Sequence, residues 1–134
     1  MQDRPNHDEL LAAVERFLDD EIVAKGEGAQ RFHGRVAANV IRIVRRELEH
    51  EEAHLASEWE SLDALLGAAP RPKGRDASRL VLQQRNEELS ERIRTADTDG
   101  AADDGDDFRE AVLSHVRLVV RDKLTVTNPS WIED

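Results

Sequence analysis

Two histidines and a glutamate in the segment LEHEEAHLASEW, residues 48–59, have the spacing of a zinc metalloprotease motif. His50, Glu51 and His54 read H-E-x-x-H, which on a helix puts both imidazoles on one face beside a glutamate that can activate a metal-bound water. The context does not fit this chemistry, because residues 49–54 include no large apolar side chain and no third histidine follows at the metzincin distance. These three residues are weak metal candidates, and we predict no bound metal or other cofactor.

The same stretch also resembles half of a di-iron site. Glu47-x-x-His50 and Glu51-x-x-His54 each match the Glu-x-x-His unit of di-iron four-helix bundles. Such a site needs the unit on two helices and a further glutamate on each of the other two, and no other predicted helix supplies a second copy. We therefore interpret residues 49–54 as a charged corner between two helices.

A second group of polar residues falls on predicted apolar faces. Winding the chain at about 100° per residue puts His33 and Glu21 inside the apolar arcs of their helices, at similar distances from the KGEG turn. In an antiparallel hairpin the two would face each other, and a buried Glu–His pair would stabilise the imidazolium or fix its tautomer. Lys123 also falls within an apolar face, Asn86 sits inside another, and His115 lies near an edge.

Two interpretations of these polar residues stay open. They are either core pairs that fix helix register or a ligand or catalytic cluster. The candidate polar cluster or ligand site comprises Glu21, His33, Lys123, Asn39 and Arg35.

One predicted helix carries a basic stripe on its outer side. The stripe consists of Arg31, Arg35, Asn39, Arg42 and Arg46. Its expected role is to pair with carboxylates of a neighbouring helix or to be solvated. The alternative is a docking site for an acidic partner surface or an anionic ligand, and the docking candidates are Arg31, Arg42 and Arg46.

Five segments repeat apolar residues at helical spacing, and no segment alternates like a strand for long. The predicted helices cover about 7–24, 29–49, 52–66, 76–96 and 106–125. Asn6 and Glu9 have the layout of a capping box at the first helix. The last segment is apolar over more than half its circumference, which predicts a central helix. The sequence thus predicts an all-α, single-domain bundle of about five helices over residues 1–134.

The acidic segment DTDGAADDGDD, residues 97–107, separates the last two predicted helices. No register of this segment provides the oxygen ligands and the glycine that an EF-hand loop requires. We expect a flexible, solvated linker.

Composition excludes several classes of function. The chain has 19 basic and 29 acidic residues, a net charge of −10, which argues against binding to nucleic acid. It has no cysteine and therefore no disulfide or thiol chemistry. No apolar run approaches the length of a membrane span, and MQDRPNHDELL lacks the pattern of a secretory signal. A cytoplasmic protein that binds neither nucleic acid nor membrane is expected.

Four stretches carry a resemblance to a known family: RPNHDELLAAVERFL, FHGRVAANVIRIVRREL, NEELSERIR and DKLTVTNPSW. Together they resemble a family of short, all-helical bacterial proteins that share a domain of unknown function. The resemblance implies frequent gene neighbours of two kinds, phosphotransferases of the aminoglycoside/choline-kinase type and acyl-CoA dehydrogenases. It implies no catalytic residues. The positions that match the family pattern are Phe32, His33, Arg35, Asn39, Asn86, Lys123, Asn128 and Pro129.

The leading functional hypothesis is a non-catalytic accessory or interaction module for a phosphotransferase-type enzyme. The alternative is an enzyme, either metal-dependent through His50 and His54 or built on Glu21 and His33. A homodimer is a candidate assembly.

Overall fold

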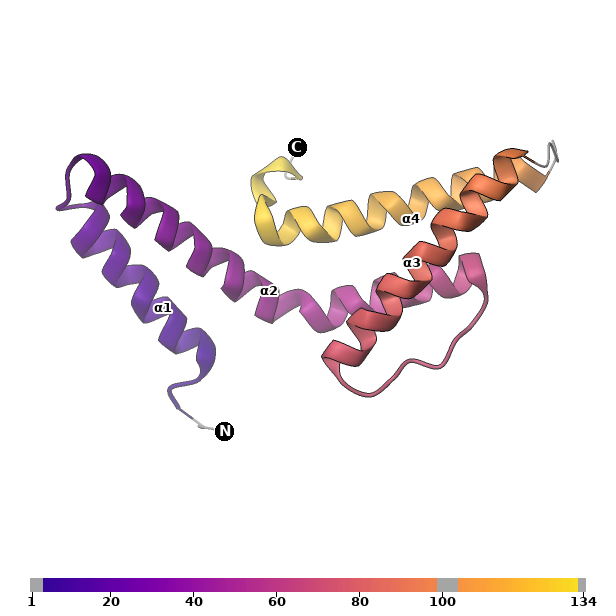
Figure 1. The fold of residues 1–134 in the computed structure, drawn as a ribbon. Helices are drawn as coiled ribbons and strands as arrows, with labels where there is room; N and C mark the ends of the chain where they lie inside the picture. The colour runs from indigo at the N-terminus through magenta and orange to yellow at the C-terminus, as the bar shows by residue number, and fades with distance from the viewer. Residues whose placement is uncertain (1–3, 99–103, 133–134) are drawn as a thin grey trace. The chain divides into compact units, whose positions relative to one another are not determined.

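The structure is a computed structural model that describes residues 4–98 and 104–132. Over these residues the chain forms α-helices α1 (His7–Phe17), α2 (Gly28–Leu66), α3 (Arg75–Thr98) and α4 (Asp104–Thr127), and no strand (Figure 1). A π-helical segment, Leu18–Val23, continues α1, and a 3-10 turn, Pro129–Trp131, follows α4. The all-α class is confirmed. The middle of the predicted acidic linker, residues 99–103, lies outside the described residues.

The N-terminus of α1 is fixed by the expected capping box. The Asn6 side chain accepts a hydrogen bond from the Glu9 amide at 2.9 Å, and the Glu9 carboxylate accepts one from the Asn6 amide at 2.9 Å. Two amides that the helix leaves without partners are satisfied in this way.

Helix α2 runs without a break through the predicted corner at residues 49–54. The prediction of two helices here, and with it the count of about five, is wrong. No glycine or proline interrupts residues 35–66, and Glu and Ala favour helix whether or not their side chains are covered. The helix ends where Gly67 adopts a left-handed conformation with φ 93°.

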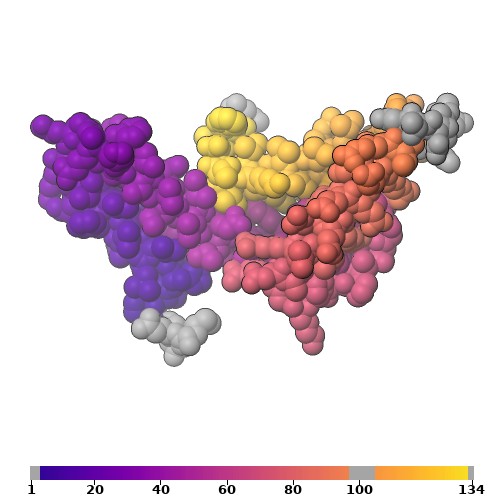
Figure 2. All heavy atoms as spheres, viewed as in Figure 1, coloured from indigo at the N-terminus to yellow at the C-terminus, as the bar shows by residue number. Residues whose placement is uncertain are grey.

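The described chain divides into two compact units, residues 1–50 and 51–134. In the first unit, α1 and the first half of α2 form an antiparallel hairpin, whose side chains pack closely in Figure 2. Gly34 is buried in the seam between the helices, where an added Cβ would lie 2.7 Å from Ile22 Cγ2. Ala38, fully covered, continues the seam. Small residues therefore allow the close approach. One domain over residues 1–134 stays a prediction.

The second unit contains the second half of α2, together with α3 and α4 (Figure 1). Its core consists of Leu55, Trp59, Leu62 and Leu65 from α2 and Leu82 and Leu89 from α3. The Arg85 guanidinium lies over the Trp59 ring at 5.1 Å, and the indole Nε1 donates to the Ala69 carbonyl at 3.1 Å. The centre of this core is therefore α2.

The prediction that the last helix is central is wrong. On α4, Leu113, Val116 and Val120 are 53%, 47% and 48% exposed, while Phe108 and Val112 only partly cover the core. A helix that is apolar all round is expected to be packed against other segments on both sides. In the described chain, α4 is packed on one side only. Among the described residues, no helix has the length and apolar content needed to cross a membrane.

Candidate functional site

A buried histidine joins the three helices of the second unit. His115 of α4 is 4% exposed, and its Nδ1 lies 2.9 Å from Ser61 Oγ of α2. Its Nε2 lies 3.4 Å from Asn86 Oδ1 of α3. The Asn86 amide nitrogen donates to Glu58 Oε1 at 2.7 Å and to the Leu82 carbonyl at 3.0 Å. We call His115, Ser61, Asn86 and Glu58 the His115 cluster.

The hydrogen bonds of this cluster assign the histidine tautomer. Because the Asn86 nitrogen donates to two acceptors, its oxygen faces His115 and accepts from Nε2–H. Nδ1 then carries the lone pair and accepts the Ser61 hydroxyl proton. Burial lowers the pKa of His115, and the negative charge of Glu58 opposes this only in part. The imidazole is therefore neutral near pH 7.

A neutral imidazole that accepts a serine hydroxyl is half of a nucleophile–base arrangement. Acyl transfer also needs donors for the developing oxyanion and open space at the hydroxyl. The same contacts tie α2, α3 and α4 together, so a role in fixing helix register is what the geometry supports.

Two members of this cluster could be noticed from the sequence. Asn86 falls inside the apolar stripe of its helix, and His115 lies near the edge of another. Nothing in the sequence pointed to Ser61 or Glu58 as members of the cluster, since both are typical of a solvated helix surface.

The three residues of the H-E-x-x-H motif lie on α2, but the Glu51 carboxylate is paired with two arginines. Glu51 is 6% exposed. Its Oε2 pairs with an Arg75 nitrogen at 2.6 Å, and its Oε1 pairs with Arg79. The hydrogen bond to Glu51 raises the pKa of Arg75. His54 Nε2 lies 3.8 Å from Asp122 Oδ1, and His50 Nε2 lies 3.9 Å from Glu49 Oε2. In the described ranges, no three histidine or carboxylate side chains are grouped so as to hold a metal ion.

The predicted burial of Glu21 and His33 is wrong. Glu21 is exposed and forms an ion pair with Lys25 on the next turn. His33 is exposed, and its ring meets the Phe32 ring edge-on at 5.5 Å. Lys123 belongs to the second unit and is exposed, as are Arg35 and Asn39 on α2.

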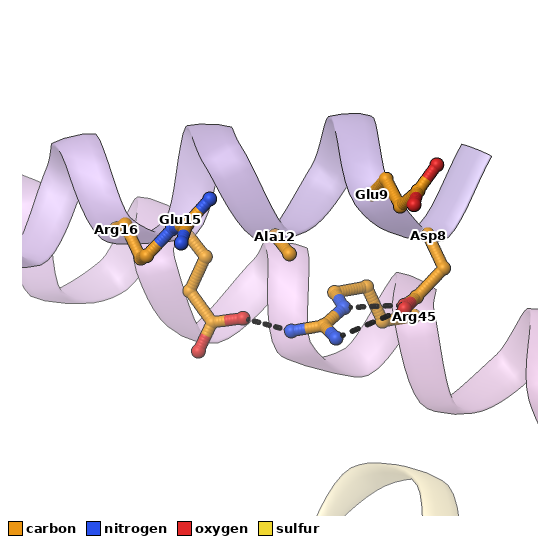
Figure 3. A pocket seen from close by; sticks show the side chains of 6 residues that line it. All are labelled: Asp8, Glu9, Ala12, Glu15, Arg16 and Arg45. Atoms are coloured by element: carbon orange, nitrogen blue, oxygen red, sulfur yellow. Dashed lines mark hydrogen bonds and ion pairs between the residues drawn. The ribbon is translucent and has the colours of Figure 1, made fainter. Parts of the chain in front are cut away.

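The basic stripe of α2 is partly used within the hairpin. Arg42 binds Glu15 at 2.7 Å and Asp19, both from α1. Arg45, which the sequence did not single out, reaches between Asp8 at 2.7 Å and Glu15 at 2.6 Å (Figure 3). Pairing with carboxylates of the neighbouring helix, the expected role, therefore accounts for Arg42.

These contacts stabilise the charged forms of Asp8, Arg42 and Arg45. The hydrogen bond from Arg45 lowers the pKa of Asp8, and the bonds to Asp8 and Glu15 raise that of Arg45. Burial disfavours the charge of Arg42, but its hydrogen bonds with Asp19 and Glu15 outweigh burial and raise its pKa.

Two hollows flank this network. One, of about 340 Å³, is shown in Figure 3 and is lined by Asp8, Glu9, Ala12, Glu15, Arg16 and Arg45. The other, of about 210 Å³, is lined by Asp8, Glu15, Arg42, Arg45, Arg46 and Glu49. Asp8 and Glu15, which pair with these arginines, also line both hollows, which disfavours an anionic ligand. Arg31 is exposed near the start of α2.

A third hollow, of about 350 Å³, lies in the second unit. It is lined by Glu52, Arg71, Pro72, Lys73, Gly74, Arg75 and Ser78. Arg71 pairs with Glu52 at 3.0 Å, and the buried Ser78 hydroxyl donates to the Pro72 carbonyl at 3.2 Å. These contacts hold the loop before α3 in place.

Uncovered apolar surface is the other notable feature of both units. The hairpin apolar face consists of Leu10, Val14 and Phe17 of α1 with Val36, Val40, Val44 and Leu48 of α2. The α4 outer face consists of Leu113, Val116 and Val120 with the exposed cations Arg117, Arg121 and Lys123 beside them. Clustered exposed apolar side chains mark interaction sites in soluble proteins.

Comparison with known proteins gives a match to a protein-family model. The model of a family described as a domain of unknown function, DUF6285, matches residues 24–131. Neither the curated proteins nor the solved structures that were searched provide a match to the chain.

Proposed function

This chain belongs to the DUF6285 family, whose function is unknown, and on that premise we propose that it is a non-catalytic interaction module. Its partner is a phosphotransferase-type enzyme, which it assists in acyl-CoA or related small-molecule metabolism. The observation that carries the proposal is the α4 outer face.

The α4 outer face has the composition of a docking surface. Leu113, Val116 and Val120 are spaced by three and four residues, so they share one side of the helix. Their side chains would be covered in a stable complex, and the hydrophobic contribution grows with the area removed from water. The flanking Arg117 and Lys123 complement an acidic rim on the partner, which favours correct orientation and fast association.

The class of partner is supported by the family resemblance, which implies gene neighbours of the phosphotransferase type. Such enzymes act on cytoplasmic metabolites, so the proposal also assigns the chain to the cytoplasm. The enzyme alternative has weaker support, because Glu51, the base that the H-E-x-x-H motif requires, is paired with two arginines.

Affinity purification from the native host tests this proposal. The wild-type chain and the Leu113→Glu/Val120→Glu variant would be captured in parallel, and the recovered proteins identified by mass spectrometry. We expect a phosphotransferase-type enzyme with the wild type, reduced at least about tenfold with the variant, because two carboxylates would be desolvated in the interface.

Leu80→Glu is the matched control, because Leu80 of α3 is a similarly exposed leucine in the same unit. It should retain the partner. Recovery of the wild-type chain alone, or equal recovery with the α4 variant, would contradict the proposal.

A further inference from the structure

We propose that the chain forms a homodimer in which the hairpin apolar face of one copy packs on the same face of a second copy. The paired hairpins make a four-helix bundle. This surface belongs to the first unit, so the inference does not depend on the α4 outer face or on the enzyme that it binds.

Helix geometry places the residues of the hairpin apolar face toward one side of the hairpin, with Val36 at the outer edge of that side. Glu15 of α1 and Asp19 of the following π-helical segment lie on the side that bonds with Arg42 of α2. Within α1, Leu10, Val14 and Phe17 are spaced by four and three residues, so they share one side of the helix, about 100° or more from Glu15.

On α2, winding from Gly34 separates Arg42 from Val40 and Val44 in the same way. Because Arg42 bonds with Glu15 and Asp19, the charged sides of both helices coincide. The apolar sides must then coincide on the opposite surface of the hairpin.

The uncovered area matches what a dimer needs. The seven side chains are between 38% and 56% exposed. By their size this corresponds to on the order of 500 Å² of apolar surface. A standard interface buries about 800 Å² per partner, of which about 65% is apolar in homodimers, or roughly 500 Å².

The charges at the two ends of this face favour a second copy as the occupant. Glu21 and His33 lie beside the face at its turn end, and His7 and Glu47 lie beside it at the open end. Each end therefore offers one carboxylate and one imidazole, and the carboxylate at the turn end is the one that pairs with Lys25. A two-fold axis that lies in the interface, along the helices or across them, brings a carboxylate opposite an imidazole. The carboxylates of the two copies are kept apart in both arrangements.

Sedimentation velocity of the full-length chain tests the dimer. Between about 1 and 100 µM, we expect the wild type to reach twice the 15.1 kDa mass of the chain. Val14→Glu/Val40→Glu should shift the dimer dissociation constant upward by at least about 100-fold, because it places charges in the centre of the interface.

Two controls keep the outcome unambiguous. Leu113→Glu/Val120→Glu should leave the dimer intact, so loss of the enzyme partner and loss of the dimer are measured separately. Circular dichroism should show wild-type helicity for Val14→Glu/Val40→Glu at matched concentration. A monomeric wild type at 100 µM, or a folded Val14→Glu/Val40→Glu variant that dimerises as the wild type does, would overturn the inference.

Discussion

The neutral state of His115 links a single side chain to the stability of the second unit. Its two ring nitrogens bond with Ser61 and Asn86, so replacing it leaves two polar partners from other helices without their bonds. An unsatisfied buried polar group costs about 1–3 kcal/mol, a large share of a small domain's stability. The His115 cluster is therefore expected to contribute to folding whether or not Ser61 meets a substrate.

The pH dependence of unfolding tests the protonation state of His115. Burial lowers its pKa in the folded protein below the usual value of 6.5. Just below pH 6.5 the unfolded chain binds a proton that the folded chain does not, so stability rises with pH in that window. Stability from this group is full above about 6.5 and is lost as pH falls toward the folded pKa.

His115→Gln should flatten that slope, since the other four histidines show no comparable burial and are retained in the variant. Urea unfolding at pH 5 to 8 provides the measurement. Identical slopes for the wild type and the variant would contradict the assignment.

At the level of secondary-structure elements, local signals predicted most of the helices. Periodicity and the Asn6–Glu9 capping box identified α1, and the KGEG turn marked the end of the π-helical segment that continues α1. These features depend on residues near in sequence. The prediction of a corner at residues 49–54 was wrong for a different reason. Loss of apolar side chains indicates that the packing against the helix changes there, but it does not end the helix.

Burial was harder to predict than helicity. Whether a face is covered depends on segments distant in sequence, so the patterns of α4 and of the first half of α2 predicted a buried face that the described chain leaves open. For the same reason Glu21 and His33 fell on apolar arcs but are exposed. Ser61 became notable only when α4 brought His115 beside it.

Substitution of Gly34 tests how closely α1 and α2 approach each other. A Cβ at position 34 would lie 2.7 Å from Ile22 Cγ2, a methyl on a stiff β-branched side chain. Gly34→Ala should therefore destabilise the protein by about 1–3 kcal/mol relative to Gly105→Ala, through overpacking.

Gly105 is the matched control because it lies in α4 with no atom within 4 Å of an added Cβ. Its change to alanine should be neutral or slightly stabilising. Urea unfolding followed by circular dichroism measures both variants. Equal stability of the two variants would mean that the seam is looser than described.

On the scale of the whole molecule, the chain uses its apolar residues in two ways. One set fills the core of the second unit around Leu62 and Trp59, and another stays uncovered on the hairpin apolar face and the α4 outer face. The net charge of −10 opposes non-specific association, while the cations on α4 provide a local exception. This distribution suits a module that assembles with itself and with a partner enzyme.

Isothermal titration calorimetry with a phosphotransferase-type enzyme from the same host would measure docking on the α4 outer face. We expect saturable binding with a dissociation constant below about 10 µM and a negative heat-capacity change from apolar burial, both lost in Leu113→Glu/Val120→Glu. Absence of binding at about 100 µM wild-type chain, or undiminished binding by that variant, would contradict this docking.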